Sequence, residues 1–452
     1  MTQAAAVSGV SLPTHTRELE DTVAQALEAA RAAGATAAEV ALGVDAGLSV
    51  SVRLGEVESL EYQRDRGLGV TVYVGQRKGS ASTGDLSREA IVETVRKAVS
   101  IASFTAEDPC AGLPDAADLA REIPDLDLAH PWPISAEEAV ELARRCEAAA
   151  LAVDARLVNS EGGAVGTHAG LRVYGNTHGF LASYPGTQHS VSCSVLGQQG
   201  EDMQRDYWYT AARDWRALES AEVVGRIAGE RTVRRLGARR LATCRAPVLF
   251  VPELARGLVG HFLSAIRGGA QYRQSSFLLG AAGEQVFPAF VAIHERPHLP
   301  RALGSAPFDA EGVATRDQDW VVGGVLRGYI LDTYGARRLG LRTTGNAGGT
   351  HNLLVEPGTD DFAGLLRRMG RGLVVTELLG QGVNGVTGDY SRGASGFWVE
   401  GGELAYPVHE VTIAGNLREM YRGVVAIGAD VDRRASLQTG SWLLGEMTIA
   451  GE

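Results

Sequence analysis

The abundance of glycine constrains this chain more than any other sequence feature. Its 452 residues include 57 glycines, well above the ~7% that is usual for soluble proteins. Glycine destabilises helix interiors but suits tight turns, bulges and strand ends. We therefore expect many strands and turns rather than a helical bundle. A chain of this length is expected to form roughly two or three domains.

The charge balance argues against two classes of partner. Lys and Arg number 43 against 54 Asp and Glu, and the net charge of -11 disfavours nucleic-acid phosphates and anionic membranes. No stretch approaches the ~20 apolar residues of a membrane span, and residues 1–21 lack the character of a signal peptide. The four cysteines, which form no CxxC pair, fit free thiols in a reducing compartment. We expect a cytoplasmic protein without nucleic-acid or membrane partners.

The hydrophobic periodicity predicts an α+β fold: two helix/antiparallel-strand units followed by a larger Gly-rich, mainly β C-terminal domain. Ser87 and Ser135 are the expected N-caps of two helices, and Gly55-Glu56 an expected turn. The expected segments are a first unit (1–105, with helices at 16–33 and 87–104), a Pro- and Asp-rich connection (106–134), a second unit (135–240, with a helix at 135–152, strands within 157–208 and a closing helix), and the C-terminal domain (241–452, with helices at 248–268 and 360–371).

One segment, His294-Glu295-Arg296-Pro297-His298, matches the HExxH pattern of zinc peptidases. That pattern binds zinc only when both histidines lie on one face of a helix. Pro297 removes a backbone donor from the required turn and disfavours the helical conformation of Arg296. We therefore reject a zinc site here and expect a loop.

Two other segments have residues suited to a cleft or interface. His261 lies beside the apolar stripe of the helix expected at 248–268, where a hydrogen-bonded core or interface histidine is the common alternative to a ligand. The run from Gly380 to Trp398 contains Asp389, Tyr390, Ser391, Arg392 and the aromatic pair Phe397-Trp398. We expect this run and the His261 helix to lie at a peptide cleft or subunit interface, with Phe397 and Trp398 as anchors. The alternatives are a Gly-rich bulged sheet for the run and an ordinary core position for the aromatic pair.

Several longer segments carry a family resemblance. They are RGLGVTVYVGQRKGSAST (66–83), GLVGHFLSAIRGG (257–269), FDAEGV (308–313), TYGARRLGLRTTGNAGGTHNL (333–353), the run LVVTELLGQGVNGVTGDYSRGASGFWVEGGELAYPVHEVTIAGNL (373–417) and the C-terminal EMTIAG. Across nearly its whole length the chain resembles the TldD/PmbA family of metallopeptidases, and within it the TldE/PmbA branch.

The resemblance implies where a zinc site would lie. TldD-like members of the family bind zinc through an HExxxH helix motif and a Cys near the C-terminus. Aligning the final Gly-His of that motif with Gly260-His261 puts Arg256 at the first His and Gly257 at the Glu. The stretch 433–444, where the Cys is expected, contains none. The resemblance thus implies that this chain has no catalytic or metal-binding residues and no cofactor of its own, because His261 alone survives.

The resemblance also implies a heterodimer in which a TldD-like catalytic subunit supplies the zinc and this chain completes the chamber. Its substrates would be unfolded or flexible peptides, as in leader-peptide removal and antitoxin degradation. Two alternatives remain. One is an independently active peptidase or other hydrolase with a non-standard site. The other is a noncatalytic binding or scaffold protein, homodimeric in the absence of a partner.

Overall fold

The computed structural model describes Val10 and residues 16–451. Residues 1–9 and 11–15, on which most of the signal-peptide expectation falls, lie outside the described residues, as does Glu452. No helix of the described part is long and apolar enough to cross a membrane.

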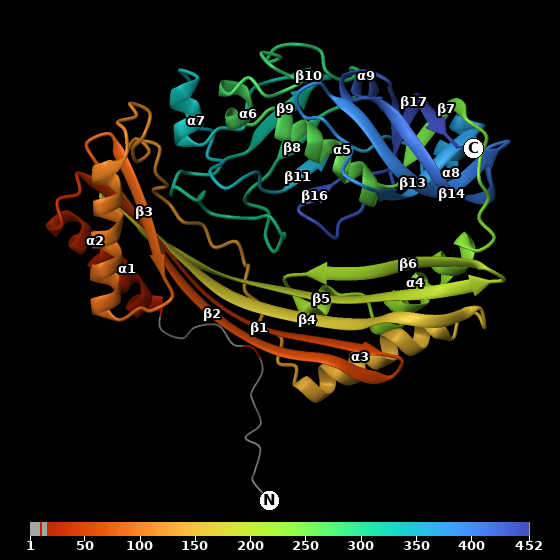
Figure 1. Ribbon diagram of the computed structural model, residues 1–452, viewed down its shortest axis with the longest axis horizontal. Helices are drawn as coiled ribbons and strands as arrows, with labels where there is room; N and C mark the ends of the chain where they lie inside the picture. The colour runs from red at the N-terminus through yellow and green to blue at the C-terminus, as the bar shows by residue number, and fades with distance from the viewer. Residues whose placement is uncertain (1–9, 11–15, 452) are drawn as a thin grey trace, which may run out of the picture.

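A long, curved antiparallel sheet forms the N-terminal half (Figure 1). Its strand order is β3-β2-β1-β4-β5-β6. The strands are β1 (Ala37–Arg53), β2 (Glu56–Val74), β3 (Arg77–Thr83), β4 (Leu157–Asn176), β5 (Leu181–Gln199) and β6 (Asp202–Ala212). The strands of the two expected units therefore make one continuous sheet, because β1 pairs with β2 on one side and with β4 on the other.

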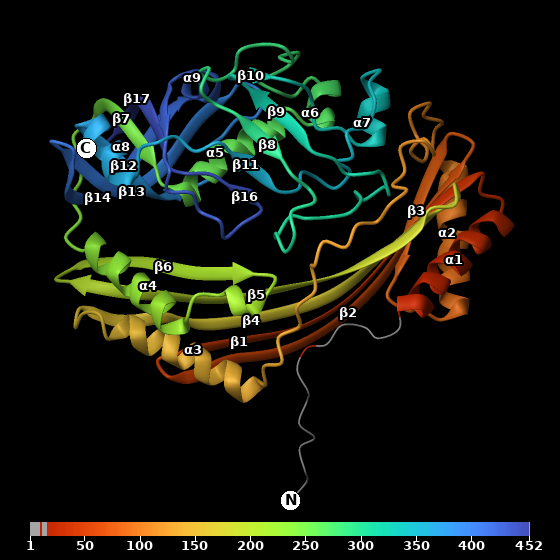
Figure 2. The ribbon, with the colours of Figure 1, turned by 180° about the vertical axis from the view of Figure 1, so that it is seen from behind.

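Helices cover one face of this sheet and leave the other free for the C-terminal half. The helices are α1 (Thr16–Ala32), α2 (Arg88–Phe104), α3 (Ala136–Leu151) and α4 (Ala221–Arg235). Leu42 contacts the α1–α2 side of the core, whereas Val50 and Val52 contact the α3–α4 side. Because side chains alternate along a strand, these even-numbered β1 residues all point to the same face. Figure 2 shows the C-terminal body lying against the opposite, concave face.

The local signals in the sequence are largely confirmed. Ser87 caps α2 by accepting a hydrogen bond from the N–H of Ala90, and Ser135 forms a capping box with Glu138. The β1–β2 turn lies one residue earlier than expected, at Leu54-Gly55. Both residues have positive φ, as a two-residue type I′ turn requires. The connection around residues 106–134 contains no helix or long strand.

The C-terminal body contains two sheets that share a large apolar core. One has the order β10-β9-β8-β11-β16 and the other β14-β13-β12-β7-β17-β15. Because β14 also pairs with β17, the second sheet closes on itself. The strands are β7 (Cys244–Phe250), β8 (Ile293–Glu295), β9 (Gln318–Val322), β10 (Val325–Leu326), β11 (Leu353–Val355), β12 (Gly372–Leu379), β13 (Asp389–Glu400), β14 (Glu403–Asn416), β15 (Val424–Ile427), β16 (Leu437–Gln438) and β17 (Trp442–Ala450).

The helices of this body differ in part from expectation. The segment expected to be helical at 248–268 begins as the end of β7, and its helix α5 spans Pro252–Ala265, with Pro252 in the first turn. Gly268 begins a new short helix instead of ending α5. The helix expected at 360–371 is present as α8 (Phe362–Met369). The sequence did not indicate the short helices α6 (Gly268–Tyr272), α7 (Thr333–Arg338) and α9 (Leu417–Arg422).

Candidate functional site

Helix α5 buries one face and leaves the other open. Leu258 and Phe262 are buried in the main core of the C-terminal body. Gly257 and Gly260 lie on the opposite face, where an added Cβ would meet no atom within 4 Å. This open face carries the positions that the family resemblance assigns to zinc ligands and a general base.

Arg256 occupies the position assigned to the first zinc-binding histidine. Its guanidinium forms an ion pair with Asp432 and donates a hydrogen bond to the hydroxyl of Tyr209 at 3.0 Å. Asp432 also accepts two hydrogen bonds from the guanidinium of Arg434, each at 2.9 Å, and one from its backbone N–H at 3.0 Å. Burial opposes ionisation of Asp432, but the hydrogen bonds from Arg434 and the charge of Arg256 hold its pKa below the ordinary value. The position assigned to the first zinc-binding histidine is therefore occupied by an arginine that is paired with Asp432 of the same chain.

Arg434 connects this region to the N-terminal sheet. Its guanidinium lies 3.6 Å from the ring centroid of Trp208 and 4.6 Å from that of Tyr209, both on β6. It also donates to Glu253 of α5 at 3.2 Å. The segment that follows Asp432, in which the family's cysteine is expected, is thus fixed between the two halves of the molecule.

His261 lies next to two residues of the run that was expected to form a cleft. Its ring packs edge-on against Tyr390, with 6.2 Å between ring centroids. Burial, with a further contribution from the positive charge of Arg392, lowers the pKa of His261. Burial raises the pKa of Tyr390 to about 12, although Arg392 opposes that shift. The structure therefore brings together three residues that the sequence analysis singled out.

Asp389 and Ser391 lie on the more exposed side of the same strand. Together with Tyr390 and the 381–385 loop they line an open hollow of about 610 Å³. Hydrogen bonds from Thr387 and Asn416 lower the pKa of the Asp389 carboxyl. The hollow thus reaches α5 through Tyr390, which lines it and contacts His261.

The aromatic pair has a different setting from the one expected. Trp398 is 3% exposed and belongs to the core of the C-terminal body, and its indole N–H donates to Glu400 at 3.1 Å. The burial of Trp398 favours the alternative of an ordinary core position over that of an interface anchor, because its ring is already covered by the chain itself. Phe397 is half-buried and lies under the guanidinium of Arg234 from α4, at 5.5 Å from the ring centroid. It therefore contacts the other half of its own chain.

The HERPH segment is not helical, as the position of Pro297 predicts. His294 and Glu295 end strand β8, where successive side chains point to opposite faces. His294 contacts Asp319 at 2.6 Å and Glu356 at 3.2 Å. His298 instead contacts the hydroxyl of Thr315 at 2.9 Å. The two histidines have separate partners, and the segment forms a strand end and a turn rather than only a loop.

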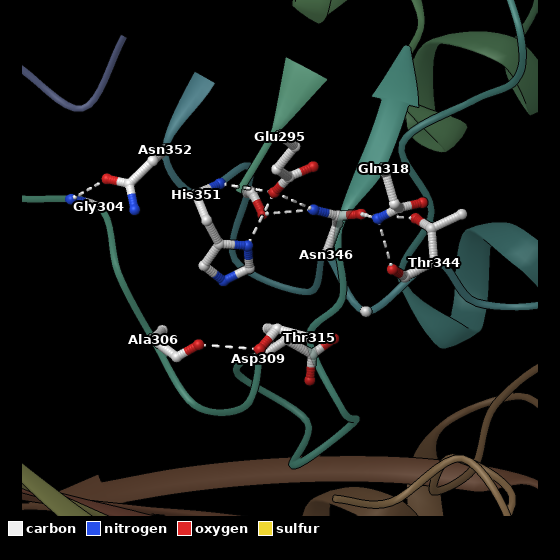
Figure 3. A network of polar contacts seen from close by, with 12 residues as sticks. Glu295, Gly304, Ala306, Asp309, Thr315, Gln318, Thr344, Asn346, His351 and Asn352 are labelled. Carbon is white, nitrogen blue, oxygen red and sulfur yellow. Dashed lines mark hydrogen bonds and ion pairs between the residues drawn. The ribbon is translucent and has the colours of Figure 1, made fainter. Parts of the chain in front are cut away.

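Glu295 takes part in a buried polar network that the sequence analysis missed (Figure 3). Its side chain is fully buried, and its Oε1 contacts Nδ1 of His351 at 2.8 Å. The same oxygen accepts a hydrogen bond from Asn346, while Oε2 accepts one from Trp320. Glu295 and His351 are 56 residues apart, so no local pattern could pair them. The local signal that the sequence offers is a glutamate shortly after the apolar run 289–293.

The described residues do not fit a zinc ion at α5. No three His, Cys, Asp or Glu side chains in the described part of the chain come together in a group that could hold a metal. At the position implied by resemblance, His261 is the one remaining ligand type, Arg256 is cationic and Gly257 has no side chain. Zinc sites need three or four donor side chains, and a guanidinium supplies no lone pair.

Models of known protein families match three successive parts of the chain. They are described as PmbA/TldA metallopeptidase domain 1 (residues 38–102), central domain (129–236) and C-terminal domain (243–451). The chain is also 50% identical to the metalloprotease PmbA of Escherichia coli O157:H7 over 96% of both chains.

The chain belongs to the PmbA/TldD metallopeptidase family.

Other family members show which branch is more similar. The PmbA homologue of Haemophilus influenzae is 48% identical over 96% of both chains, whereas the TldD homologue of that organism is 22% identical over 80% of this chain and 79% of its own length. The higher identity lies with the PmbA-named proteins.

Solved structures have the same fold. A Bacteroides thetaiotaomicron protein described as a candidate modulator of DNA gyrase superposes with a TM-score of 0.92 at 28% identity, over 97% of this chain and 100% of its own. TldE from Thermococcus kodakarensis superposes with a TM-score of 0.84 over 95% of this chain and 100% of its own. At 22% identity, this second likeness shows the fold alone.

Proposed function

We propose that this chain is the subunit of a two-subunit metallopeptidase that does not itself bind the catalytic zinc. The ion pair between Arg256 and Asp432 carries the proposal, because it lies where the family resemblance puts a zinc-binding histidine. A guanidinium repels a divalent cation and uses Asp432 as its own counter-ion. Gly257 also leaves no carboxylate to act as general base on a zinc-bound water.

A TldD-like subunit supplies the zinc and the chemistry in this proposal, and this chain completes the chamber that receives flexible peptides. The cluster of His261, Tyr390 and Arg392, with the hollow lined by residues 381–385 and 389–391, is the proposed surface for the partner or the peptide. Its accessible polar groups are the half-buried His261 and Arg392, which lie beside the buried ring of Tyr390, and partly covered polar groups of this kind suit the rim of an interface. The four cysteines are all free, which supports a cytoplasmic location.

Cleavage assays with defined subunits test this function. An unstructured peptide is incubated with this chain, with a TldD-like chain and with an equimolar mixture, and the products are quantified by mass spectrometry. We expect cleavage that needs the TldD-like chain, is increased by this chain and is lost on chelation. Cleavage by this chain alone would instead support an independent hydrolase. A self-associating chain that neither binds the TldD-like chain nor changes its activity would support a homodimeric scaffold, and either result would overturn the proposal.

A matched pair of variants tests the proposed contact surface. Arg392 is half-buried beside His261, whereas Arg371 lies over the ring of Trp398, at 5.3 Å from the centroid. Arg392→Gln should weaken binding of the TldD-like chain or of the peptide, because the positive charge next to Tyr390 is removed. Arg371→Gln should leave both affinities unchanged. Equal affinities for the two variants would exclude this surface from the contact.

A further inference from the structure

A second concave site lies between the two halves of the molecule. A cavity of about 680 Å³ is bounded by the concave face of the N-terminal sheet and by loops 303–310 and 347–351 of the C-terminal body. Ala41, Gly43 and Asp45 of β1 line it, on the face opposite the helices. Its volume is within the range of about 300–1,000 Å³ that is typical of small-ligand sites. No residue of α5 lines this cavity, so it is distinct from the α5 face that carries Arg256 and His261.

The acidic groups of the cavity already have partners. Asp45 pairs with the ring of His168 at 3.0 Å. Asp309 is 3% exposed and accepts hydrogen bonds at 2.9 Å from three backbone N–H groups, those of Glu311, Val313 and Ala347. These carboxylates are therefore not the counter-ions of the cationic groups in the same cavity.

Two guanidinium groups in the cavity have no acidic partner among the described residues. Arg213 is half-buried and donates only to the backbone carbonyls of Thr187, Ala302 and Leu303, which uses three of its five N–H donors. Burial and the positive charge of Arg172 lower the pKa of Arg213. Arg172 is exposed on β4, and its side chain makes no hydrogen bond or ion pair with a described residue. Two neighbouring like charges in a concave site favour binding of an anion.

His351 adds an oriented hydrogen-bonding group on the C-terminal side of the cavity. Its Nδ1 is fixed by Glu295, and its Nε2 makes no hydrogen bond with a described residue. In Figure 3 the Nε2 side of the ring points away from Glu295, toward the side where Ala306 and Asp309 lie. A carboxylate that fixes one ring nitrogen sets the direction of the other. His351 therefore presents one defined polar atom to the cavity.

We propose that this cavity binds a carboxylate group of a peptide, with Arg172 and Arg213 as its cationic partners and His351 as a hydrogen-bonding group for the adjoining part of the peptide. Guanidinium groups bind carboxylates through charge-assisted, often paired, hydrogen bonds. The aromatic rings of Phe308 and Tyr184, whose centroids are 5.2 Å apart, provide a wall for the rest of the ligand. The inference rests on the proposed function in that the ligand is a peptide.

Calorimetric titration of the lone, full-length chain tests the site with three probes. They are acetyl-Ala-Ala-Ala with a free C-terminal carboxylate, the same peptide as its C-terminal amide, and acetyl-Ala-Glu-Ala amide. We expect at least one carboxylate peptide to bind about tenfold more tightly than the neutral amide, as a charge-assisted hydrogen bond provides. Preference for the first peptide assigns the site to a chain terminus, and preference for the third assigns it to an acidic side chain. Equal binding of all three, or none, would overturn the proposal.

Arg172→Gln should remove this preference by raising the Kd of the carboxylate peptide about tenfold, while Arg172→Lys should retain part of it. Because the Arg172 side chain is exposed and makes no hydrogen bond or ion pair with a described residue, these variants should fold normally. Arg96→Gln is the matched control, since Arg96 is an exposed residue of α2 on the other face of the sheet. An unchanged preference in Arg172→Gln would contradict the assignment.

Histidine ring NMR gives a second readout that does not depend on affinity. In the 15N-histidine-labelled chain, the Nε2 resonance of His351, assigned by its absence from His351→Gln, should shift when the carboxylate peptide is added. His189 is the internal reference, because both of its ring nitrogens already have partners. A shift equal for the two histidines would contradict the site. Neither experiment involves proteolysis. If the carboxylate peptide fails both tests while the chain still supports cleavage by a TldD-like subunit, the carboxylate site is refuted and the proposed function stands.

Discussion

The buried carboxylate of Glu295 holds His351 at two points, accepting hydrogen bonds from its backbone N–H at 2.7 Å and from its ring Nδ1 at 2.8 Å. Asn346 and Trp320 donate to the same carboxylate at 2.9 and 2.8 Å. Its contacts therefore come from four donors within the chain. The glutamate of a motif that resembles a zinc signature instead connects strand β8 to the loop that precedes β11.

Replacing Glu295 should destabilise the protein strongly. In Glu295→Gln the amide N–H₂ would face groups that are themselves donors, and we expect the free energy of unfolding to fall by about 3 kcal/mol. Urea denaturation monitored by circular dichroism measures this change. Glu356→Gln is the control, because the Glu356 side chain is exposed and its one polar contact among the described residues is with His294. If both variants unfold at the same urea concentration, the Glu295 network does not support the fold.

The second prediction concerns Trp398 as a core residue. Trp398→Ala should lower the stability of the isolated chain by roughly 3–5 kcal/mol, because it removes a large side chain that is 3% exposed. Leu379→Ala on neighbouring β12 should change it little, since Leu379 is 53% exposed. Thermal melts of both variants make the comparison. A Trp398→Ala variant that melts like the wild type but binds a TldD-like subunit weakly would show that Trp398 is an interface anchor and not a core residue.

The third prediction is a pH dependence that arises from a buried acid. Burial raises the pKa of Glu311 from 4.5 to about 7, with repulsion from Asp309 and Glu39 adding to the effect. The folded state therefore binds more protons than the unfolded state between these values, so the contribution of Glu311 to stability falls as pH rises through that window. Glu311→Gln should consequently gain stability relative to the wild type between pH 5 and pH 8. A difference in melting temperature that does not change with pH would contradict this.

His261→Ala should have a modest effect. The ring makes an edge-on contact with Tyr390, and loss of such a pair should lower stability by about 0.5–1.5 kcal/mol. Because His261 belongs to the proposed contact surface, the variant should bind a TldD-like subunit more weakly. The assembled complex should still cleave, because one ligand-type residue without a second cannot hold catalytic zinc. Complete loss of cleavage in a complex that still assembles would show that His261 takes part in the chemistry.

The sequence predicts those parts of the structure that depend on near neighbours. The Ser87 and Ser135 caps and the non-helical HERPH segment follow from interactions within a few residues. The joining of β1 to β4 could not be predicted, because it pairs residues such as Val40 and Gly175 across the intervening connection. For the same reason the Glu295–His351 pair was missed. A large apolar side chain such as Trp398 suits both a core and an interface, and only the packing around it distinguishes the two.

The zinc content of the isolated chain is the most direct test of the central claim. The chain is purified without chelator, incubated with excess zinc, desalted and measured by elemental analysis, alongside a TldD-like subunit treated identically. With Arg256 paired to Asp432 and no carboxylate at Gly257, the account predicts far less than one zinc per chain here and about one in the TldD-like subunit. About one tightly held zinc in this chain would contradict the account.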